Sequence, residues 1–386
     1  MVEARVNNGF IRVPTKLKEN SKIYVERVDE QSILLIPVSL DLEKVYIEPT
    51  THCNLSCIMC VRNVWEDDHT EMAFSDFEKI VEDLKEFPML GEVTFGGYGE
   101  PFAHKNILDM VRLVKEDLGA KVRVSTNGTL IGENAQEIIK SGIDTLIVSL
   151  DAVSSDKYKD IRGFDINSIE SNIRTVIEEK KCLKSRIPII EIEFVAMKNN
   201  IDELKKVIDF AHEINDVDRI LVTNVFAHTE KMSEERLYPG DKEVLFLDFS
   251  KYALSRLMKL SLPQTDITTE RYCQFILNNS CVISATGNVY PCYRLMHTYP
   301  AYIQDRVKRV VHHPFGNVFN EKLGKIWTSE EYVRFRNKVR RFGFPSCPDC
   351  VFRDGCWFVE ETVLDCWYNS PSCADCLWSR GIIRCP

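Results

Sequence analysis

Residues 48–60 decide the fold and read Glu-Pro-Thr-Thr-His-Cys-Asn-Leu-Ser-Cys-Ile-Met-Cys. They place Cys53, Cys57 and Cys60 in a C-x3-C-x2-C spacing, directly after a short apolar segment. Three thiolates on one tight loop can hold three irons of a cubic iron–sulfur cluster and leave the fourth iron open to a ligand. The alternative is a structural zinc site, which needs a fourth ligand. His52 is badly placed as a fourth ligand, because two adjacent residues, here His52 and Cys53, cannot easily both point at one metal.

Composition limits the classes of protein to which this chain can belong. With 386 residues, the chain is too long for one ordinary hydrophobic core, and we expect two or three domains. A net charge of −9 argues against a general nucleic-acid binder. No apolar run approaches the roughly 18 residues that span a bilayer, and the N-terminus lacks an apolar signal core. We therefore expect a cytoplasmic protein that binds neither nucleic acid nor a membrane.

The number of cysteines, fourteen, is the unusual feature of this composition. Many of them fall in C-x2-C pairs, and no signal peptide directs the chain to an oxidising compartment. This combination favours metal binding over disulfides. Intracellular disulfides of hyperthermophiles remain the alternative, since composition does not exclude them.

Strand and helix patterns alternate through residues 41–235. A helix from Ser75 has Glu78 three residues on, which predicts a capping box, and an apolar face that repeats at helical spacing. Repeated βα units indicate a parallel sheet with helical crossovers, and six units are enough for a partial barrel. The predicted strands are 45–48, 92–95, 122–125, 145–150, 189–196 and 219–225; the other predicted helices are 106–118, 134–141, 168–179 and 202–214.

Three further regions surround this core. Residues 1–40 read as short strands and predict a small N-terminal β unit that packs as an appendage. Residues 236–270 carry leucines among charges and predict a helical connector. Residues 271–386 hold ten of the cysteines and predict a separate cysteine-rich domain. The expected fold class is thus α/β, with a partial (β/α)6 TIM-like barrel between a β unit and a cysteine-rich domain.

Glycine-rich and polar loops follow the predicted strands. The run Gly96-Gly97-Tyr98-Gly99-Glu100-Pro101 comes after the second strand, and glycines allow the backbone to approach a ligand closely. The run Ser125-Thr126-Asn127-Gly128 follows the third strand, and Ser149-Leu150-Asp151 follows the fourth. Because the carboxyl ends of parallel strands meet at one edge of a barrel, we expect these loops to form one site with the cysteine loop.

The cysteine spacing and the series of loops resemble those of the radical SAM enzymes. The resemblance implies a 4Fe–4S cluster on Cys53, Cys57 and Cys60 whose open iron chelates S-adenosylmethionine. Electron transfer from the cluster then releases a 5′-deoxyadenosyl radical, which makes the three cysteines the catalytic centre. Met59 stands where the family usually has an aromatic residue that shields the cluster or contacts adenine. The other implied cofactor contacts are Gly96, Gly97, Gly99 and Glu100 for the methionine part, Ser125 and Asn127 for the ribose, and Ser149, Asp151 and Arg162.

The C-terminal cysteines resemble those of the SPASM extension, which holds two auxiliary 4Fe–4S clusters. Glu360 stands where that pattern has a cysteine, and Cys366 is the expected substitute. A pair of zinc ribbons is the alternative, because two C-x2-C pairs also have zinc spacing. The resemblance implies one cluster on Cys273, Cys281, Cys292 and Cys366 and another on Cys347, Cys350, Cys356 and Cys376, with Cys373 and Cys385 as further candidate ligands.

The N-terminal β unit is joined to Cys-Asn-Leu-Ser-Cys-Ile-Met-Cys-Val-Arg-Asn-Val-Trp at residues 53–65 and Phe-Gly-Gly-Tyr-Gly-Glu-Pro at residues 95–101. Within the radical SAM enzymes, this combination resembles the maturases encoded beside tungsten-containing aldehyde ferredoxin oxidoreductases. This resemblance implies action on the oxidoreductase or its tungstopterin cofactor. Two alternatives remain: a peptide-modifying radical enzyme, and a multi-cluster electron carrier or zinc scaffold without catalysis. The expected partners are a low-potential electron donor of the ferredoxin or flavodoxin type, and either the oxidoreductase or a substrate peptide.

Overall fold

A long, curved sheet organises the molecule. The computed structural model describes residues 5–7, 10–12, 22–27, 33–239 and 243–385. Nine strands of these residues form one sheet in the order β11-β10-β9-β8-β7-β6-β5-β12-β13, and β5 to β10 run parallel in chain order. All six predicted strands are confirmed, each within two residues at either end. They are β5 (Lys44–Ile47), β6 (Glu92–Phe95), β7 (Lys121–Thr126), β8 (Thr145–Ser149), β9 (Ile189–Ala196) and β10 (Val217–Asn224).

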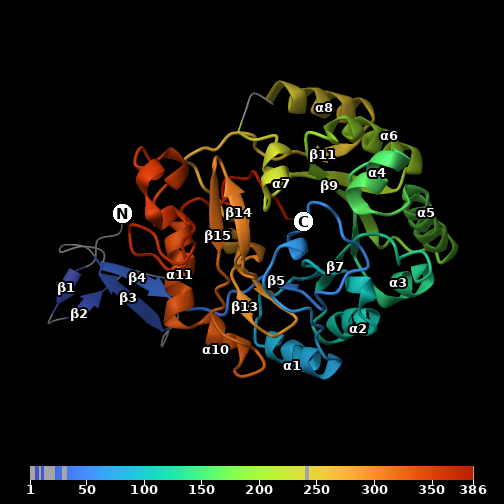
Figure 1. Cartoon of the computed structure of the whole chain (residues 1–386). Helices are drawn as coiled ribbons and strands as arrows, with labels where there is room; N and C mark the ends of the chain where they lie inside the picture. Colours follow the sequence, from blue (N-terminus) through green and yellow to red (C-terminus); the bar gives the residue numbers. More distant parts are fainter. Residues whose placement is uncertain (1–4, 8–9, 13–21, 28–32, 240–242, 386) are drawn as a thin grey trace.

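Helices cover the outer face of this sheet, as Figure 1 shows for the right half of the molecule. Alternate strand residues such as Val93, Val122 and Ile192 point outward and are fully buried in one core with the helices. Some of the opposite positions, such as Glu191 and Glu193 on β9, carry polar residues that face the inside of the curved sheet. The covering helices are α1 (Phe74–Leu84), α2 (Ile107–Asp117), α3 (Ala135–Ser141), α4 (Ser155–Arg162), α5 (Ile166–Cys182) and α6 (Leu204–Ile214).

Two helix predictions need correction. Helix α1 begins at Phe74 after Ala73, and no side chain caps it, so the predicted capping box at Ser75 is wrong. Ser75 lies inside the first turn, where its hydroxyl cannot serve as the N-cap. Helix α4 was not predicted, because its sequence is strongly polar and shows little apolar periodicity. It carries Arg162 at its last position.

The sheet extends beyond the six predicted strands on both sides. The expected helical connector contains α8 (Glu243–Ser255) and also β11 (Lys259–Ser261), which pairs parallel with β10. On the other side, β12 (Ser280–Ile283) pairs parallel with β5, and β13 (Val289–Tyr290) follows it. The cysteine-rich region therefore shares a sheet with the barrel. Main-chain hydrogen bonds between β12 and β5 connect the two regions.

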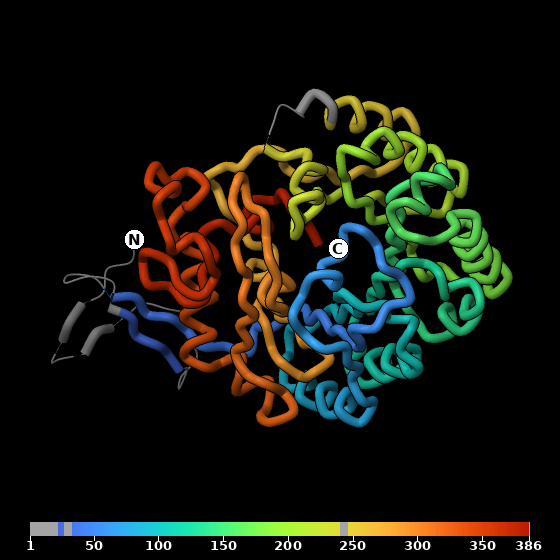
Figure 2. Tube along the Cα trace, viewed as in Figure 1, coloured from blue at the N-terminus to red at the C-terminus, as the bar shows by residue number. Residues whose placement is uncertain are grey.

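The last residues of the chain return to the barrel, where the red segment ends near its centre in Figure 2. The Asn224 side chain donates a hydrogen bond to the carbonyl of Ile382 at 3.1 Å, and the Arg384 N–H donates to Thr223 Oγ1 at 2.8 Å. The C-terminal segment thus binds along the end of β10, on the side where the partial barrel is open.

The N-terminal β unit packs on the cysteine-rich region, as Figure 1 shows beside α11. The Tyr24 hydroxyl donates to the carbonyl of Thr328 at 2.9 Å, and Arg334 on α11 donates to the carbonyl of Val25 at 3.2 Å. Within the described ranges no helix is long and apolar enough to cross a membrane. The elements outside the barrel are β1 (Arg5–Asn7), β2 (Phe10–Arg12), β3 (Ile23–Arg27), β4 (Ile33–Pro37), α7 (Glu230–Glu234), α9 (Gln274–Leu277), β14 (Tyr299–Ile303), β15 (Arg306–Val310), α10 (Leu323–Trp327) and α11 (Glu330–Arg340).

Candidate active site at the carboxyl ends of the strands

The cysteine loop follows the carboxyl end of β5 and has a defined shape. Cys53, Cys57 and Cys60 are each half-buried. The Cys60 N–H donates to the carbonyl of Cys57 at 3.0 Å, and the Asn63 side chain donates to the same carbonyl at 2.9 Å. Burial raises the pKa of the Cys57 thiol and raises that of Cys60 to about 11. These thiols therefore keep their protons until a metal or cluster displaces them.

Arg162 is aimed at this loop from α4. Its Nε and Nη2 lie 2.7 and 2.6 Å from Asp151 Oδ2, and its Nη1 lies 4.0 Å from Cys57 Sγ. Asp151 is fully buried and also accepts the Val195 N–H at 2.7 Å. Burial opposes the charge of Arg162, but Asp151 and Cys57 outweigh it and hold the pKa of the guanidinium above its usual value. Asp151 thus orients Arg162, and Arg162 is the member of the pair that reaches the cysteine loop.

The glycine-rich loop after β6 is pressed against the segment that leads into the cysteine loop. A Cβ atom on Gly99 would lie 2.0 Å from the carbonyl oxygen of Thr50, and one on Gly97 would lie 2.5 Å from the Glu48 carboxylate. Gly97 also has a φ of +118°, which side-chain-bearing residues rarely adopt. Glycine is therefore required here for contact between two loops of the protein, in addition to any contact with a ligand.

Glu100 ties the loops together. Its carboxylate accepts hydrogen bonds from the Phe102 N–H at 3.1 Å, the Thr126 hydroxyl at 2.7 Å and the Asn127 N–H at 2.7 Å. The Asn127 side chain in turn donates to Asn54 Oδ1 at 2.9 Å and lies 3.6 Å from Cys53 Sγ. The loops after β6 and β7 are thus fixed against the cysteine loop. The sequence predicted that these residues share a site, and the structure brings them together.

Other predicted site residues line the inside of the barrel. Ser125 and Ser149 are half-buried at inward positions of β7 and β8, and their hydroxyls make no hydrogen bond to another described residue. The Cβ of Ser125 lies 3.5 Å from the Cβ position of Gly96. Met59 packs against a small apolar cluster that includes Ile161 of α4. The two serine hydroxyls are therefore open to a ligand, while Met59 closes the side of the loop.

The sequence analysis missed a buried polar pair behind the glycine loop. Glu48 accepts the Tyr98 N–H at 2.8 Å, and its other carboxylate oxygen lies 3.7 Å from His297 Nε2. His297 Nδ1 lies 2.7 Å from Asp67, and its ring is 4.0 Å from that of Trp65. Glu48 is the first residue of the stretch 48–60, so its place next to the cysteine loop was visible in the sequence. No local pattern pointed to His297, which comes from the cysteine-rich region.

His297 predicts a pH-dependent stability. Burial lowers its pKa, but the hydrogen bond to Asp67 and the charge of Glu48 raise it to about 9. Because 9 lies above the ordinary 6.5, the contribution is complete below pH 6.5 and is lost as pH rises to about 9. We expect His297→Gln to lower the free energy of unfolding by about 3 kcal/mol more at pH 6 than at pH 10. Chemical denaturation at both pH values measures this difference.

The matched control for this prediction is His312→Gln, because His312 is half-exposed and lies 4.0 Å from Asp67. That variant should show less than a third of the pH-dependent difference. Equal loss of stability at pH 6 and pH 10 in His297→Gln would contradict a charged His297.

One group of C-terminal cysteines gathers beside a buried arginine. Burial raises the pKa of the Cys273 thiol, and Cys292 and Cys376 raise it further. Burial, Cys376, Cys292 and Cys273 likewise raise the pKa of Cys373. Arg294 is fully buried next to them, donates to Asp375 at 2.7 Å, and its Nη1 has no hydrogen-bond partner among the described residues. A buried cation beside four thiols suits an anionic thiolate-bound cluster.

A second group of cysteines lines one cavity. Cys347, Cys350, Cys356 and Cys366 surround a space of about 290 Å³ together with Phe358 and other apolar residues. Burial raises the pKa of Cys347 to about 12, and Cys366 and Cys356 contribute to the rise. Four thiols around an apolar space of this size match the ligand set of a cubic cluster.

These groups differ from the division that the resemblance implied. Cys281 is buried on β12, where Arg336 is the charged group that acts on its thiol. Cys376 lies with Cys273, Cys292 and Cys373, joined to Cys373 by the hydrogen bond from its N–H to the Cys373 carbonyl at 3.2 Å, whereas Cys366 lines the cavity of the second group. Cys385 accepts a hydrogen bond from Trp378 at 3.2 Å, and burial, Glu193 and Cys292 raise the pKa of its thiol.

No three His, Cys, Asp or Glu side chains in the described part of the chain lie close enough to hold a single metal ion. A cubic cluster binds each thiolate to a different iron, so its ligands need not converge on one point.

Known proteins share both halves of this architecture. The radical SAM superfamily model matches residues 47–220, and the SPASM model, an iron–sulfur cluster-binding domain, matches residues 273–351. The chain belongs to the radical SAM enzymes that carry a SPASM domain. It is 37% identical to the tungsten-containing aldehyde ferredoxin oxidoreductase cofactor-modifying protein of Pyrococcus furiosus, over 89% of this chain and 97% of that protein.

A relative matched over a shorter part of the chain, and solved structures of lower sequence identity, support the same fold. A probable GTP 3′,8-cyclase of Pyrococcus horikoshii is 31% identical over 46% of this chain and 55% of its own length. The structure of Streptococcus suis SuiB bound to S-adenosylmethionine is 18% identical, with a TM-score of 0.59 over 84% of this chain and 73% of SuiB. That of anSMEcpe with bound AdoMet is also 18% identical, with a TM-score of 0.57 over 86% and 90%.

Proposed function

We propose that the protein cleaves S-adenosylmethionine reductively at Cys53, Cys57 and Cys60 and modifies a tungsten oxidoreductase or its tungstopterin cofactor. The observation that carries this proposal is the 37% identity over nearly the whole length of a cofactor-modifying maturase. When bound, the cluster and S-adenosylmethionine would supply a carbon-centred radical that abstracts hydrogen from the substrate.

The residues at the barrel mouth fit these cofactors. Three half-buried thiols on one loop leave one position of a cube open. Arg162, held by Asp151 near Cys57, supplies a fixed cation for the methionine carboxylate. The hydroxyls of Ser125 and Ser149 face the barrel interior and suit hydrogen bonds to ribose or the amino group. Glu100 and Asn127 would act mainly by holding the loops that carry these groups.

We assign the two auxiliary clusters from the cysteine groups. One would be held by Cys273, Cys292, Cys373 and Cys376, and the other by Cys347, Cys350, Cys356 and Cys366. Cys281 and Cys385 are left out of both sets. An aromatic series connects the cysteine loop to the first set, with ring centroids 5.7 Å apart for Trp65 and Tyr98 and 6.3 Å apart for Tyr98 and Tyr293. Tyr293 directly follows Cys292, so these rings lie along a short route for an electron.

The test is anaerobic turnover with S-adenosylmethionine and a reduced ferredoxin as the low-potential donor. We expect 5′-deoxyadenosine to form slowly alone, and at least tenfold faster with aldehyde ferredoxin oxidoreductase that lacks its mature cofactor. Mass spectrometry of the oxidoreductase and of its extracted pterin identifies which one is changed. Mature oxidoreductase serves as the control.

Two outcomes would separate the alternatives. Stimulation by short cysteine- or tyrosine-bearing peptides, and none by the oxidoreductase, would replace the proposed substrate with a peptide. No deoxyadenosine under any condition from protein with a full complement of iron and sulfide would leave an electron carrier as the function.

A further inference from the structure

A large cavity lies between the barrel strands and the C-terminal segment of the chain. Its volume is about 650 Å³, within the range of small-molecule sites. Lys44, the first residue of β5, and Arg219, near the start of β10, form part of its wall. The cysteine loop instead follows the last residue of β5. Lys44 and Arg219 thus lie at the amino ends of their strands, and none of the residues assigned to the candidate active site line the cavity.

The wall of the cavity is cationic although the protein is acidic. Its charged residues are four cations, Lys44, Arg219, Arg380 and Arg384, and one carboxylate, Glu270. The chain as a whole has a net charge of −9. A local excess of positive charge in an enclosed space attracts anions more strongly than the same charges on an open surface.

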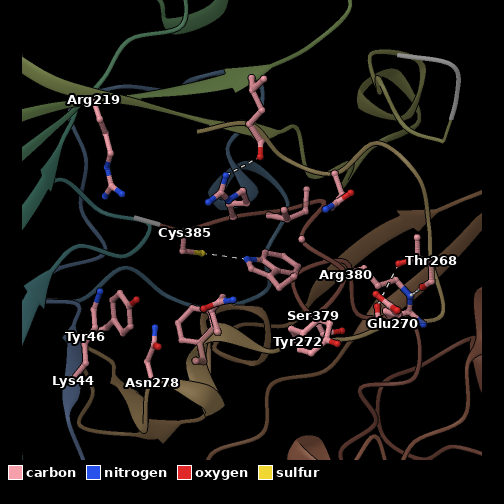
Figure 3. A pocket seen from close by; sticks show the side chains of 18 residues that line it. Lys44, Tyr46, Arg219, Thr268, Glu270, Tyr272, Asn278, Ser379, Arg380 and Cys385 are labelled. Atoms are coloured by element: carbon pink, nitrogen blue, oxygen red, sulfur yellow. Dashed lines mark hydrogen bonds between the residues drawn. The ribbon is translucent and has the colours of Figure 1, made fainter. Parts of the chain in front are cut away.

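The cations fall into two parts of the cavity. Figure 3 shows Arg380 beside Glu270 at one end, and Lys44 and Arg219 around Cys385 at the other. Arg380 donates to four protein acceptors, including the carbonyl of Cys376, and so has a structural role next to the first cysteine group. The other cavity cations, at the end near Cys385, are Lys44, Arg219 and Arg384.

Charge compensation at that end is incomplete. Lys44 lies 2.7 Å from Glu92, and Arg219 shares Glu191 with Arg123, each at 2.8 Å. Arg384 has no carboxylate partner among the described residues. Its guanidinium makes one hydrogen bond, from Nη1 to the carbonyl of Leu262 at 2.8 Å. Of the three cavity cations at this end, Lys44 and Arg219 each have a carboxylate partner, and Arg384 has none among the described residues.

Two of these arginines also have unused donors. Arg219 Nε is buried and has no hydrogen-bond partner among the described residues. Arg219 and Arg384 line the same cavity, and the Arg384 guanidinium makes only the one hydrogen bond to Leu262 among the described residues. An anion between them would accept the free N–H groups and balance the unpaired charge of Arg384. Paired guanidiniums match the oxygens of a phosphate group, which accept several hydrogen bonds at once.

Aromatic rings line the same space. The rings of Tyr46 and Phe275 are 5.2 Å apart at the wall, and Trp378 lies beside Cys385. Lys44 Nζ stands 4.2 Å from the centre of the Tyr46 ring. Aromatic walls with a few polar groups are typical of sites that bind flat, ring-containing molecules.

We propose that this cavity binds a small molecule in which a sugar or a hydroxylated side chain joins a phosphate ester to a flat heteroaromatic ring. The phosphate would lie between Arg219 and Arg384, and the ring against the aromatic wall. The site lies outside the radical centre, and its binding does not rest on the proposed function. Pterin phosphates and nucleotides share this chemistry.

Calorimetric titration of the anaerobic, cluster-loaded protein tests the proposal without turnover. The probes are neopterin, neopterin monophosphate, guanosine monophosphate and inorganic phosphate. We expect at least one phosphorylated ring to bind tenfold or more tightly than neopterin, and its affinity to fall with added salt. Inorganic phosphate should compete with it. The tighter of the two phosphorylated probes identifies the preferred ring.

Variants locate the binding. Arg384→Gln and Arg219→Gln should each raise the dissociation constant of the phosphorylated probe at least tenfold, with neopterin binding unchanged. Arg384→Lys should recover part of the loss. The control is Lys259→Gln, an exposed residue on β11 outside the cavity. If neither phosphorylated probe bound the wild-type protein more tightly than neopterin, or if both glutamine variants bound the phosphorylated probe unchanged, the proposal would be overturned.

Discussion

Cys57→Ala should abolish 5′-deoxyadenosine formation, with a rate at least 100-fold below that of the wild-type protein. Cys57 lies between the other two thiols of the loop, so its loss leaves two ligands for a cluster that needs three. Its sulfur also lies 4.0 Å from Arg162 Nη1. We expect the variant to lose roughly four irons per chain, which is one cubic cluster. Iron analysis and anaerobic turnover measure the two effects together.

Cys182→Ala is the matched control, because Cys182 is the exposed last residue of α5 and belongs to none of the cysteine groups. It should keep the wild-type iron content and rate. Deoxyadenosine formation by Cys57→Ala at the wild-type rate would show that the cysteine loop is not the catalytic centre.

Cys376→Ala and Cys281→Ala should differ sharply in iron content, although both cysteines are buried in the cysteine-rich region. Cys376 acts on the thiols of Cys273, Cys292 and Cys373, whereas Arg336 is the charged neighbour of Cys281. We expect Cys376→Ala to lose roughly four of about twelve irons, and Cys281→Ala to keep all of them. Anaerobic iron and sulfide analysis, with electron paramagnetic resonance of the reduced clusters, measures the difference.

This pair of variants tests the grouping of cysteines directly. If Cys281→Ala lost a cluster and Cys376→Ala did not, the assignment made from the structure would be wrong for both. Thermal unfolding of the two variants under the same conditions controls for loss of fold. Cys373→Ala should behave like Cys376→Ala, since the two belong to one group.

Much of the barrel could be predicted from the sequence because its signals are local. Each of the six strands shows an apolar run or an alternation of apolar and polar residues, and each functional loop directly follows a strand in the chain. The carboxyl ends of parallel strands meet at one edge, so order along the chain was enough to bring Cys53, Gly99, Asn127 and Asp151 together. Helix α4 was missed because its mean hydropathy is low and its turns are held by tertiary contacts.

The roles of individual residues depended on geometry that the sequence does not contain. Asp151 and Arg162 were both predicted as cofactor contacts, and the structure shows that one carboxylate oxygen holds the guanidinium. Glu100 accepts three hydrogen bonds from its own neighbourhood. A polar residue in a motif can contact a ligand or support its neighbour, and only the positions of its hydrogen-bond partners distinguish the two.

The sequence alone determined the class of chemistry, through the close spacing of Cys53, Cys57 and Cys60 and the loops after the strands. Residues a few positions apart are held together by the chain itself, so their spacing in the sequence already limits how far apart they can lie in space. The tertiary structure decided which distant cysteines meet, and that the cations Lys44, Arg219 and Arg384 share one cavity. Residues more than a hundred positions apart come together only through packing of whole elements, and no local pattern records that packing.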